Sequence, residues 1–154
     1  MQDCQCQCGV VKFAIKARPV LRAICHCEIC QDFNQKPFSD IAIFFTKDVD
    51  LPQANTVDYQ KYRPPPAVQR GRCSACNAPA IELLQMPLMP ALTLVPSVNV
   101  GDQTILPNPS LHIFYHRRVS DIDDDIVKYS GYWKSQFAFG KHFISSLIKQ
   151  KKNA

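Results

Sequence analysis

The sequence predicts a mainly β domain of short strands that ends in one helix. Twelve prolines among 154 residues argue against long helices through the middle of the chain, because proline breaks a helix interior. Apolar side chains recur with a period of two in short runs, as expected for half-buried strands. The C-terminal segment instead carries an apolar stripe at helical spacing. Together these observations predict short strands first and a helix last.

The expected strands follow one another with proline-rich connections between them. Val11, Phe13 and Ile15 alternate with other residues directly after the first cysteine pair, so a half-buried strand is expected there. The triple proline Pro64-Pro65-Pro66 marks a loop. The other candidate strands are Leu21–Cys25, 41–46, 57–62, 81–84, 92–95 and 111–115.

The helical stripe begins near Lys141, and polar residues occupy the opposite side of the expected helix. Such a helix could lie on a membrane surface or on a partner, but packing on its own domain is the interpretation we favour. The stripe consists of Phe143, Ile144, Leu147 and Ile148.

Seven of the eight cysteines stand in three tight groups, and this is the strongest chemical signal in the chain. In an extended strand a Cys-x-Cys pair presents both sulfurs on one face. A Cys-x-x-Cys segment folds as a knuckle that is common in structural zinc sites. Two such pairs can complete one tetrahedral zinc site, formed by Cys6, Cys8, Cys73 and Cys76.

The remaining group, Cys25, Cys27 and Cys30, then predicts a second zinc site with only three protein ligands. A zinc ion held by three side chains keeps a position for water or substrate. An alternative is that both sites are structural, with His26, Cys4 or a distant residue as the fourth ligand of the second site. Another alternative is a disulfide framework, which is typical of short secreted chains.

The N-terminal residues show no charged segment followed by an apolar one, so we expect no signal peptide and a cytoplasmic location. The hydrophobic fraction of 46% and the chain length suit one soluble domain. No apolar run approaches the roughly 20 residues that cross a bilayer, so no membrane partner is expected. The formal net charge is +5. Seven zinc-bound thiolates and two zinc ions would lower it to about +2, which argues against nucleic acid as a partner.

The order of these motifs resembles the glutathione-dependent formaldehyde-activating enzyme family, which includes centromere protein V. The resemblance spans most of the chain, from about residue 4 to 129, and implies a β-tent fold of mainly antiparallel strands stapled by zinc. The matching residues are Cys6, Cys8 and Gly9, then Cys25, His26, Cys27 and Cys30, then Cys73, Cys76 and Pro79, and finally His112, Ile113 and Phe114.

The resemblance implies a structural zinc on the four-cysteine group and a catalytic zinc on Cys25, Cys27 and Cys30. The implied reaction joins glutathione to formaldehyde as S-hydroxymethylglutathione, a carbon-sulfur lyase activity, so a small thiol such as glutathione is the expected partner. A homo-oligomer is compatible with this activity. Residues 1–133 would form the family domain, and 134–154 a basic helical extension. The alternative function is a non-catalytic zinc-binding interaction module whose basic helix contacts a protein or nucleic acid.

Several residues depart from the family pattern. Gln31 stands where relatives often carry arginine, which removes a charge that could anchor substrate, and Lys36 is near the expected pocket. Asn77 replaces a glycine and can adopt the same left-handed backbone conformation.

Other polar residues receive structural interpretations. We expect His26 to support the second zinc site without binding the metal, and His112 to be a hydrogen-bonded core residue. The acidic run 123–125 is interpreted as a solvated loop. Cys4 is the unassigned thiol, and it permits a shifted pairing with Cys6 in place of Cys8.

Overall fold

The computed structural model describes residues 1–62 and 68–152, so the proline loop expected at Pro64-Pro65-Pro66 lies outside the described residues. The chain divides into two compact units. The first unit consists of Met1–Pro19 and Ala42–Leu106, and the second of Val20–Ile41 and Pro107–Ala154. Both contain short strands, which confirms the mainly β fold class predicted from the sequence.

A small antiparallel sheet in the first unit has the strand order β1-β2-β5. Its strands are β1 (Gln2–Gln5), β2 (Lys12–Ile15) and β5 (Val49–Asp50). Phe13 and Ile15 are buried while Lys12 is exposed, which is the alternation expected from the sequence. Cys4 pairs with Phe13 across the sheet, so its side chain joins the core of this unit.

The other strands of the first unit form an antiparallel meander in the order β9-β8-β7-β6, with β4 beside β9. Arg70 and Glu82 face each other across β7 and β8 and form a buried ion pair. The bounds are β4 (Ser39–Phe45), β6 (Val57–Lys61), β7 (Val68–Cys73), β8 (Pro79–Leu84) and β9 (Leu92–Pro96). Short 3₁₀ turns connect these elements at Thr46–Asp48, Ala54–Thr56, Ser97–Asn99 and Gln103–Ile105.

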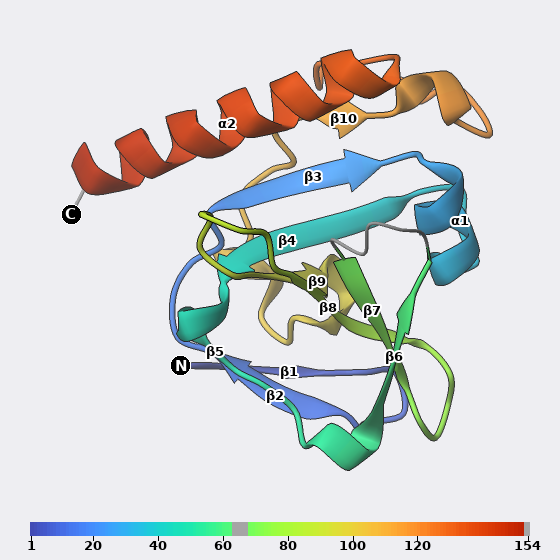
Figure 1. The fold of residues 1–154 in the computed structure, drawn as a ribbon, viewed down its shortest axis with the longest axis vertical. Helices are drawn as coiled ribbons and strands as arrows, with labels where there is room; N and C mark the ends of the chain where they lie inside the picture. The colour runs from blue at the N-terminus through green and yellow to red at the C-terminus, as the bar shows by residue number, and fades with distance from the viewer. Residues whose placement is uncertain (63–67, 153–154) are drawn as a thin grey trace. The chain divides into compact units, whose positions relative to one another are not determined.

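The second unit places two helices around a short parallel strand pair. Strand β10 pairs with β3 so that His112 lies opposite Ile24 and Ile113 opposite Cys25. The long C-terminal helix α2 contacts both strands (Figure 1). The bounds are β3 (Leu21–Cys25), α1 (Glu28–Asn34), β10 (His112–Ile113), a 3₁₀ turn at Tyr115–Arg117, and α2 (Tyr132–Lys152). Strand β4 begins in this unit, beside β3.

The expected strands are found at their predicted places, with three differences. The strand expected at 111–115 keeps only two residues and then turns, because Phe114 adopts a left-handed conformation with φ 55°. Helix α1 and strands β1, β5 and β7 were not predicted. Helix α2 begins at Tyr132, well before the apolar stripe used to predict it. Within the described residues, no helix is long and apolar enough to span a membrane.

Gly71 in β7 is required by close packing. A Cβ at this position would lie 2.5 Å from Val57 Cγ1 and 2.7 Å from the backbone oxygen of Ile81. We expect Gly71→Ala to lower the free energy of unfolding by about 1–3 kcal/mol, because a backbone atom cannot move aside cheaply. The matched control is Gly140→Ala in α2, where nothing lies within 4 Å of the added atom.

The control should stabilise the protein by about 0.5–1 kcal/mol, since alanine is the better helix former. Urea unfolding curves of the two variants check both signs. A Gly71→Ala protein that unfolds at the wild-type midpoint would show that β7 is not packed as described.

Candidate functional site

Four cysteine sulfurs converge in the first unit. The Sγ atoms of Cys6, Cys8, Cys73 and Cys76 all lie within 4.8 Å of one another. Cys6 Sγ is 3.5 Å from Cys8 Sγ, which is 3.6 Å from Cys73 Sγ. Cys6 and Cys73 are buried, whereas Cys8 and Cys76 are exposed. The structure therefore brings together the four residues that the sequence grouped as one metal site.

Two tight turns aim these sulfurs. Strand β1 ends at Gln5, and the next residues turn back through Gly9, which has a φ of 77°. The expectation that Cys6 and Cys8 share one face of an extended strand is therefore wrong, although their sulfurs do meet. The Val11 N–H donates to Cys6 Sγ at 3.3 Å, which fixes this sulfur in the turn.

The second turn is the expected Cys-x-x-Cys knuckle. Strand β7 ends at Cys73, and the Asn77 N–H donates to the Cys73 carbonyl at 2.9 Å. Asn77 has a φ of 59°, the left-handed conformation expected where relatives carry glycine. Cys4 lies outside the group, and burial raises the pKa of its thiol to about 11.

Three cysteine sulfurs converge in the second unit. The Sγ atoms of Cys25, Cys27 and Cys30 all lie within 4.8 Å of one another. Cys25 ends β3, Cys27 is the N-cap of α1, and Cys30 lies in the first turn of that helix. The Cys30 N–H donates to Cys27 Sγ at 3.4 Å. Cys25 and Cys30 are buried and Cys27 is partly exposed, so solvent reaches this group at Cys27.

The donor sets fit zinc. A Zn–S bond of about 2.3 Å places the sulfurs of a tetrahedral site about 3.8 Å apart, close to the separations found here. All eight cysteines are free thiols, so they are not consumed by disulfides. The neighbouring thiols of Cys27 and Cys30, and then burial, raise the pKa of Cys25 well above its usual value. Crowded thiols of this kind need a cation to be stable as thiolates.

Gln31 ties the three-cysteine segment to the rest of the second unit. Its side-chain amide donates to the backbone oxygen of His26 at 2.6 Å and to that of Arg117 at 2.8 Å. Gln31 thus holds the Cys-His-Cys segment against the 3₁₀ turn that follows β10. The residue expected only as a missing arginine has a structural role of its own. Lys36 is exposed at the end of α1.

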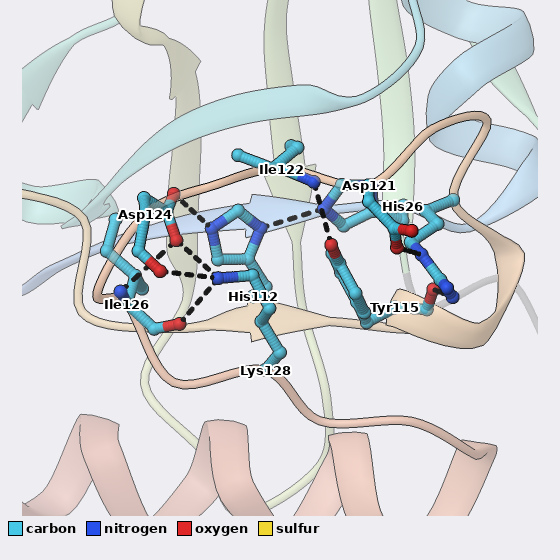
Figure 2. Close-up of polar contacts among 9 residues, drawn as sticks. His26, His112, Tyr115, Asp121, Ile122, Asp124, Ile126 and Lys128 are labelled. Carbon is cyan, nitrogen blue, oxygen red and sulfur yellow. Dashed lines mark hydrogen bonds and ion pairs between the residues drawn. The ribbon is translucent and has the colours of Figure 1, made fainter.

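His26, between two of the cysteines, belongs to a chain of hydrogen bonds (Figure 2). His26 Nε2 lies 2.8 Å from His112 Nδ1, and His112 Nε2 lies 3.0 Å from Asp124 Oδ2. Lys128 Nζ pairs with the other oxygen of Asp124 at 2.5 Å. Both histidines are almost fully buried, at 1% and 0% exposure. His112 is therefore the hydrogen-bonded core residue that was expected.

The Asp124 carboxylate sets the donor-to-acceptor direction of this chain of hydrogen bonds. The hydrogen bond from Lys128, followed by that from His112, lowers the pKa of Asp124 to about 2, so Asp124 accepts the His112 Nε2–H. His112 Nδ1 is then free to accept the His26 Nε2–H. Burial, followed by electrostatic interaction with His112 and with Arg118, lowers the pKa of His26 to about 4. His26 Nδ1 is left as a buried atom without a partner among the described residues.

Sequence reasoning missed Asp124, Lys128 and Ser135. The acidic run 123–125 was interpreted as a solvated loop, yet its middle residue binds His112 and Lys128. Buried Ser135 of α2 accepts the Phe114 N–H at 2.8 Å and stabilises the turn after β10. The contacts of Asp124 with His112 and of Ser135 with Phe114 join separate segments of the chain, so they leave no local sequence signal, whereas Asp124 and Lys128 are only four residues apart.

We expect both buried histidines to carry their proton on Nε2. Two-dimensional ¹H–¹⁵N NMR of the imidazole rings at neutral pH distinguishes this tautomer from the Nδ1–H form, since the two nitrogens differ in chemical shift. Asp124→Asn should perturb the His112 signals, because the amide can present either an oxygen or an NH₂ group to Nε2.

The matched control is Asp123→Asn, which changes an exposed neighbour and should leave the ring signals unchanged. A proton on Nδ1 of either ring in the wild-type protein would contradict the assigned direction of the chain.

The chain is similar to one family of known proteins and, at low sequence identity, to a solved structure. The solved crystal structure of a Rhodobacter sphaeroides protein shares 16% sequence identity, with 64% of this chain and 87% of that chain covered and a TM-score of 0.48. No curated protein matches the chain. The glutathione-dependent formaldehyde-activating enzyme family matches residues 1–117, a stretch that contains both cysteine groups, His26 and His112. The chain therefore belongs to the glutathione-dependent formaldehyde-activating enzyme family.

Proposed function

We propose that this chain is a zinc-dependent, carbon-sulfur lyase-like enzyme that joins glutathione or a related thiol to a small aldehyde. The observation that carries the proposal is the contrast between its two cysteine groups. The first group supplies four sulfurs, enough to enclose a zinc ion, whereas the second supplies three. Membership of the family supports glutathione and formaldehyde as the natural pair of reactants.

The two groups would have different roles. Cys6, Cys8, Cys73 and Cys76 would hold a structural zinc, and Cys25, Cys27 and Cys30 would hold a catalytic one. When bound at the second group, zinc would lower the pKa of an incoming thiol and so favour its thiolate at neutral pH. The partial exposure of Cys27 supports an approach from that side.

Residues around the second group would keep it in a fixed geometry. Gln31 anchors the backbone between Cys25 and Cys27 through its hydrogen bond to His26 O. The His26 to His112 bond anchors the side chain of the same residue. These contacts would position the second cysteine group. A fixed site accelerates a reaction between two small partners by holding them together.

The overall reaction is an addition. The sulfur of the thiol forms a bond to the aldehyde carbon, and the C=O π bond breaks. The proton released by the thiol ends on the former carbonyl oxygen, so the product is an S-hydroxymethyl thioether and no oxidant or reductant is consumed. In the reverse direction the same site would break a carbon-sulfur bond.

Exchange NMR with ¹³C-formaldehyde and glutathione tests this function, because it measures the rate of adduct formation at equilibrium. The zinc-loaded protein should accelerate exchange saturably, and Cys27→Ser should return the rate to that of the uncatalysed reaction. Cys4→Ala is the matched control, since Cys4 is a cysteine outside both groups. Exchange at the uncatalysed rate with wild-type protein would favour the non-catalytic interaction module.

The division of the sites predicts a metal count. Cys27→Ser should lower bound zinc from two ions per chain to one and leave the far-ultraviolet circular dichroism unchanged. Elemental analysis of the purified variant gives the count. A variant that unfolds, or that retains both ions, would contradict an independent second site.

Cys73→Ser should act mainly on folding. Structural zinc contributes its binding energy to the folded state, so its loss is expected to cost on the order of several kcal/mol. Thermal unfolding of zinc-loaded protein, compared with Cys27→Ser, measures the difference. A Cys73→Ser variant that melts like the wild type would contradict the assignment of the structural zinc to its group.

Residues 1–133 as the family domain and 134–154 as an extension also remain our proposal. Helix α2 crosses the boundary between them at its first turn.

A further inference from the structure

Helix α2 exposes a row of large apolar side chains. Four of its residues fall within an arc of about 60° on the helix, at 3.6 residues per turn. Their exposed fractions are 71%, 75%, 59% and 52%. We call this row the outer stripe, and it consists of Trp133, Phe137, Ile144 and Ile148.

The outer stripe is not the face that α2 uses to pack. Ser135, Ala138 and Phe143 are buried on the opposite side of the helix, and α2 contacts β10 and β3 of its own unit (Figure 1). A helix with one packed face ordinarily carries polar residues on the other. An exposed apolar row of this size marks an interaction surface.

The charges of α2 have one sign. The helix contains no acidic residue, and Lys134, Lys141 and Lys152 fall along one edge of the outer stripe. Lys149 and Lys151 add to the charge at its C-terminal end. In the described part of the chain, none of the salt bridges involves a lysine of α2. The surface therefore combines apolar area with positive charge.

We propose that the outer stripe docks on an anionic membrane surface, with α2 lying in the plane of the interface. Lipid headgroups accept the lysines while the acyl boundary accepts Phe137, Ile144 and Ile148. Trp133, at the start of the helix, suits the headgroup level because its ring has a large apolar body and a polar N–H.

Other binding partners would match only the apolar row or only the lysines of this surface. A second copy of the helix would cover the stripe but bring two lysine rows together without an acidic partner. A nucleic-acid backbone would pair with the lysines and leave the apolar row in water. The proposal departs from the expectation of no membrane partner, which rested on the absence of a membrane-spanning segment. The expectation that the apolar stripe packs on its own domain is wrong for Ile144 and Ile148, which are exposed.

Trp133 is the only tryptophan of the chain and serves as the reporter. Full-length zinc-loaded protein is titrated with vesicles of phosphatidylcholine, or of phosphatidylcholine mixed with phosphatidylglycerol. The mixed vesicles should shift Trp133 emission to shorter wavelength and sediment the protein. Phosphatidylcholine alone should do neither, and high salt should weaken binding because it screens the lysines.

Two double variants separate the contributions and keep the reporter. Phe137→Ser with Ile144→Ser should weaken partitioning roughly 100-fold, because two large apolar side chains are lost from the interface. Lys134→Gln with Lys141→Gln should weaken it about tenfold or more. The matched control is Val98→Ser with Val119→Ser, which replaces two apolar residues of 72% and 65% exposure elsewhere.

The control should bind like the wild type. Circular dichroism should show that all variants are folded, since every replaced side chain is exposed. Unshifted emission with the mixed vesicles would overturn the proposal. So would equal binding by the Phe137→Ser, Ile144→Ser variant, or a vesicle-free dimer that shifts Trp133 emission by itself.

Discussion

Sulfur atoms from two distant segments must occupy the same few ångströms, and the first unit is organised around this requirement. Cys8 and Cys73 are 65 residues apart in the chain, yet their sulfurs lie 3.6 Å apart. The turn through Gly9 and the left-handed Asn77 bend the backbone so that this is achieved. Since Cys6 and Cys73 also belong to the hydrophobic core cluster, the same contact closes the core.

The second unit reaches a comparable rigidity through buried polar contacts. His26, His112 and Asp124 form a chain in which His112 Nδ1 and the Asp124 carboxylate each accept a hydrogen bond, and Gln31 joins two backbone carbonyls. A buried polar network stabilises one conformation only when its members are satisfied. This network surrounds the residue between Cys25 and Cys27, so it restrains the three-cysteine group without supplying a ligand to it.

Helix α2 has two distinct faces, and they have different consequences. Its inner face supports the candidate site, because the Ser135 hydroxyl accepts the N–H of Phe114 directly after the His112 strand. Its outer face contributes nothing to that packing and carries the stripe and the lysines. A binding event at the outer face would therefore occur on the helix whose inner face stabilises the turn after β10.

Local patterns along the chain were enough to predict the fold class, most strands, the grouping of seven cysteines and the resemblance to the family, because these depend on local periodicity and short spacings. The predicted helix started late, because the apolar stripe used to predict it begins only at Phe143, and two members of that stripe, Ile144 and Ile148, lie on the exposed face of α2. The folded chain was needed to reveal that Asp124 orients His112, that Gln31 bridges two segments, and which face of α2 meets solvent. The first two join separate segments of the chain, and the third depends on which side of the helix meets β3 and β10, so all three depend on the folded geometry.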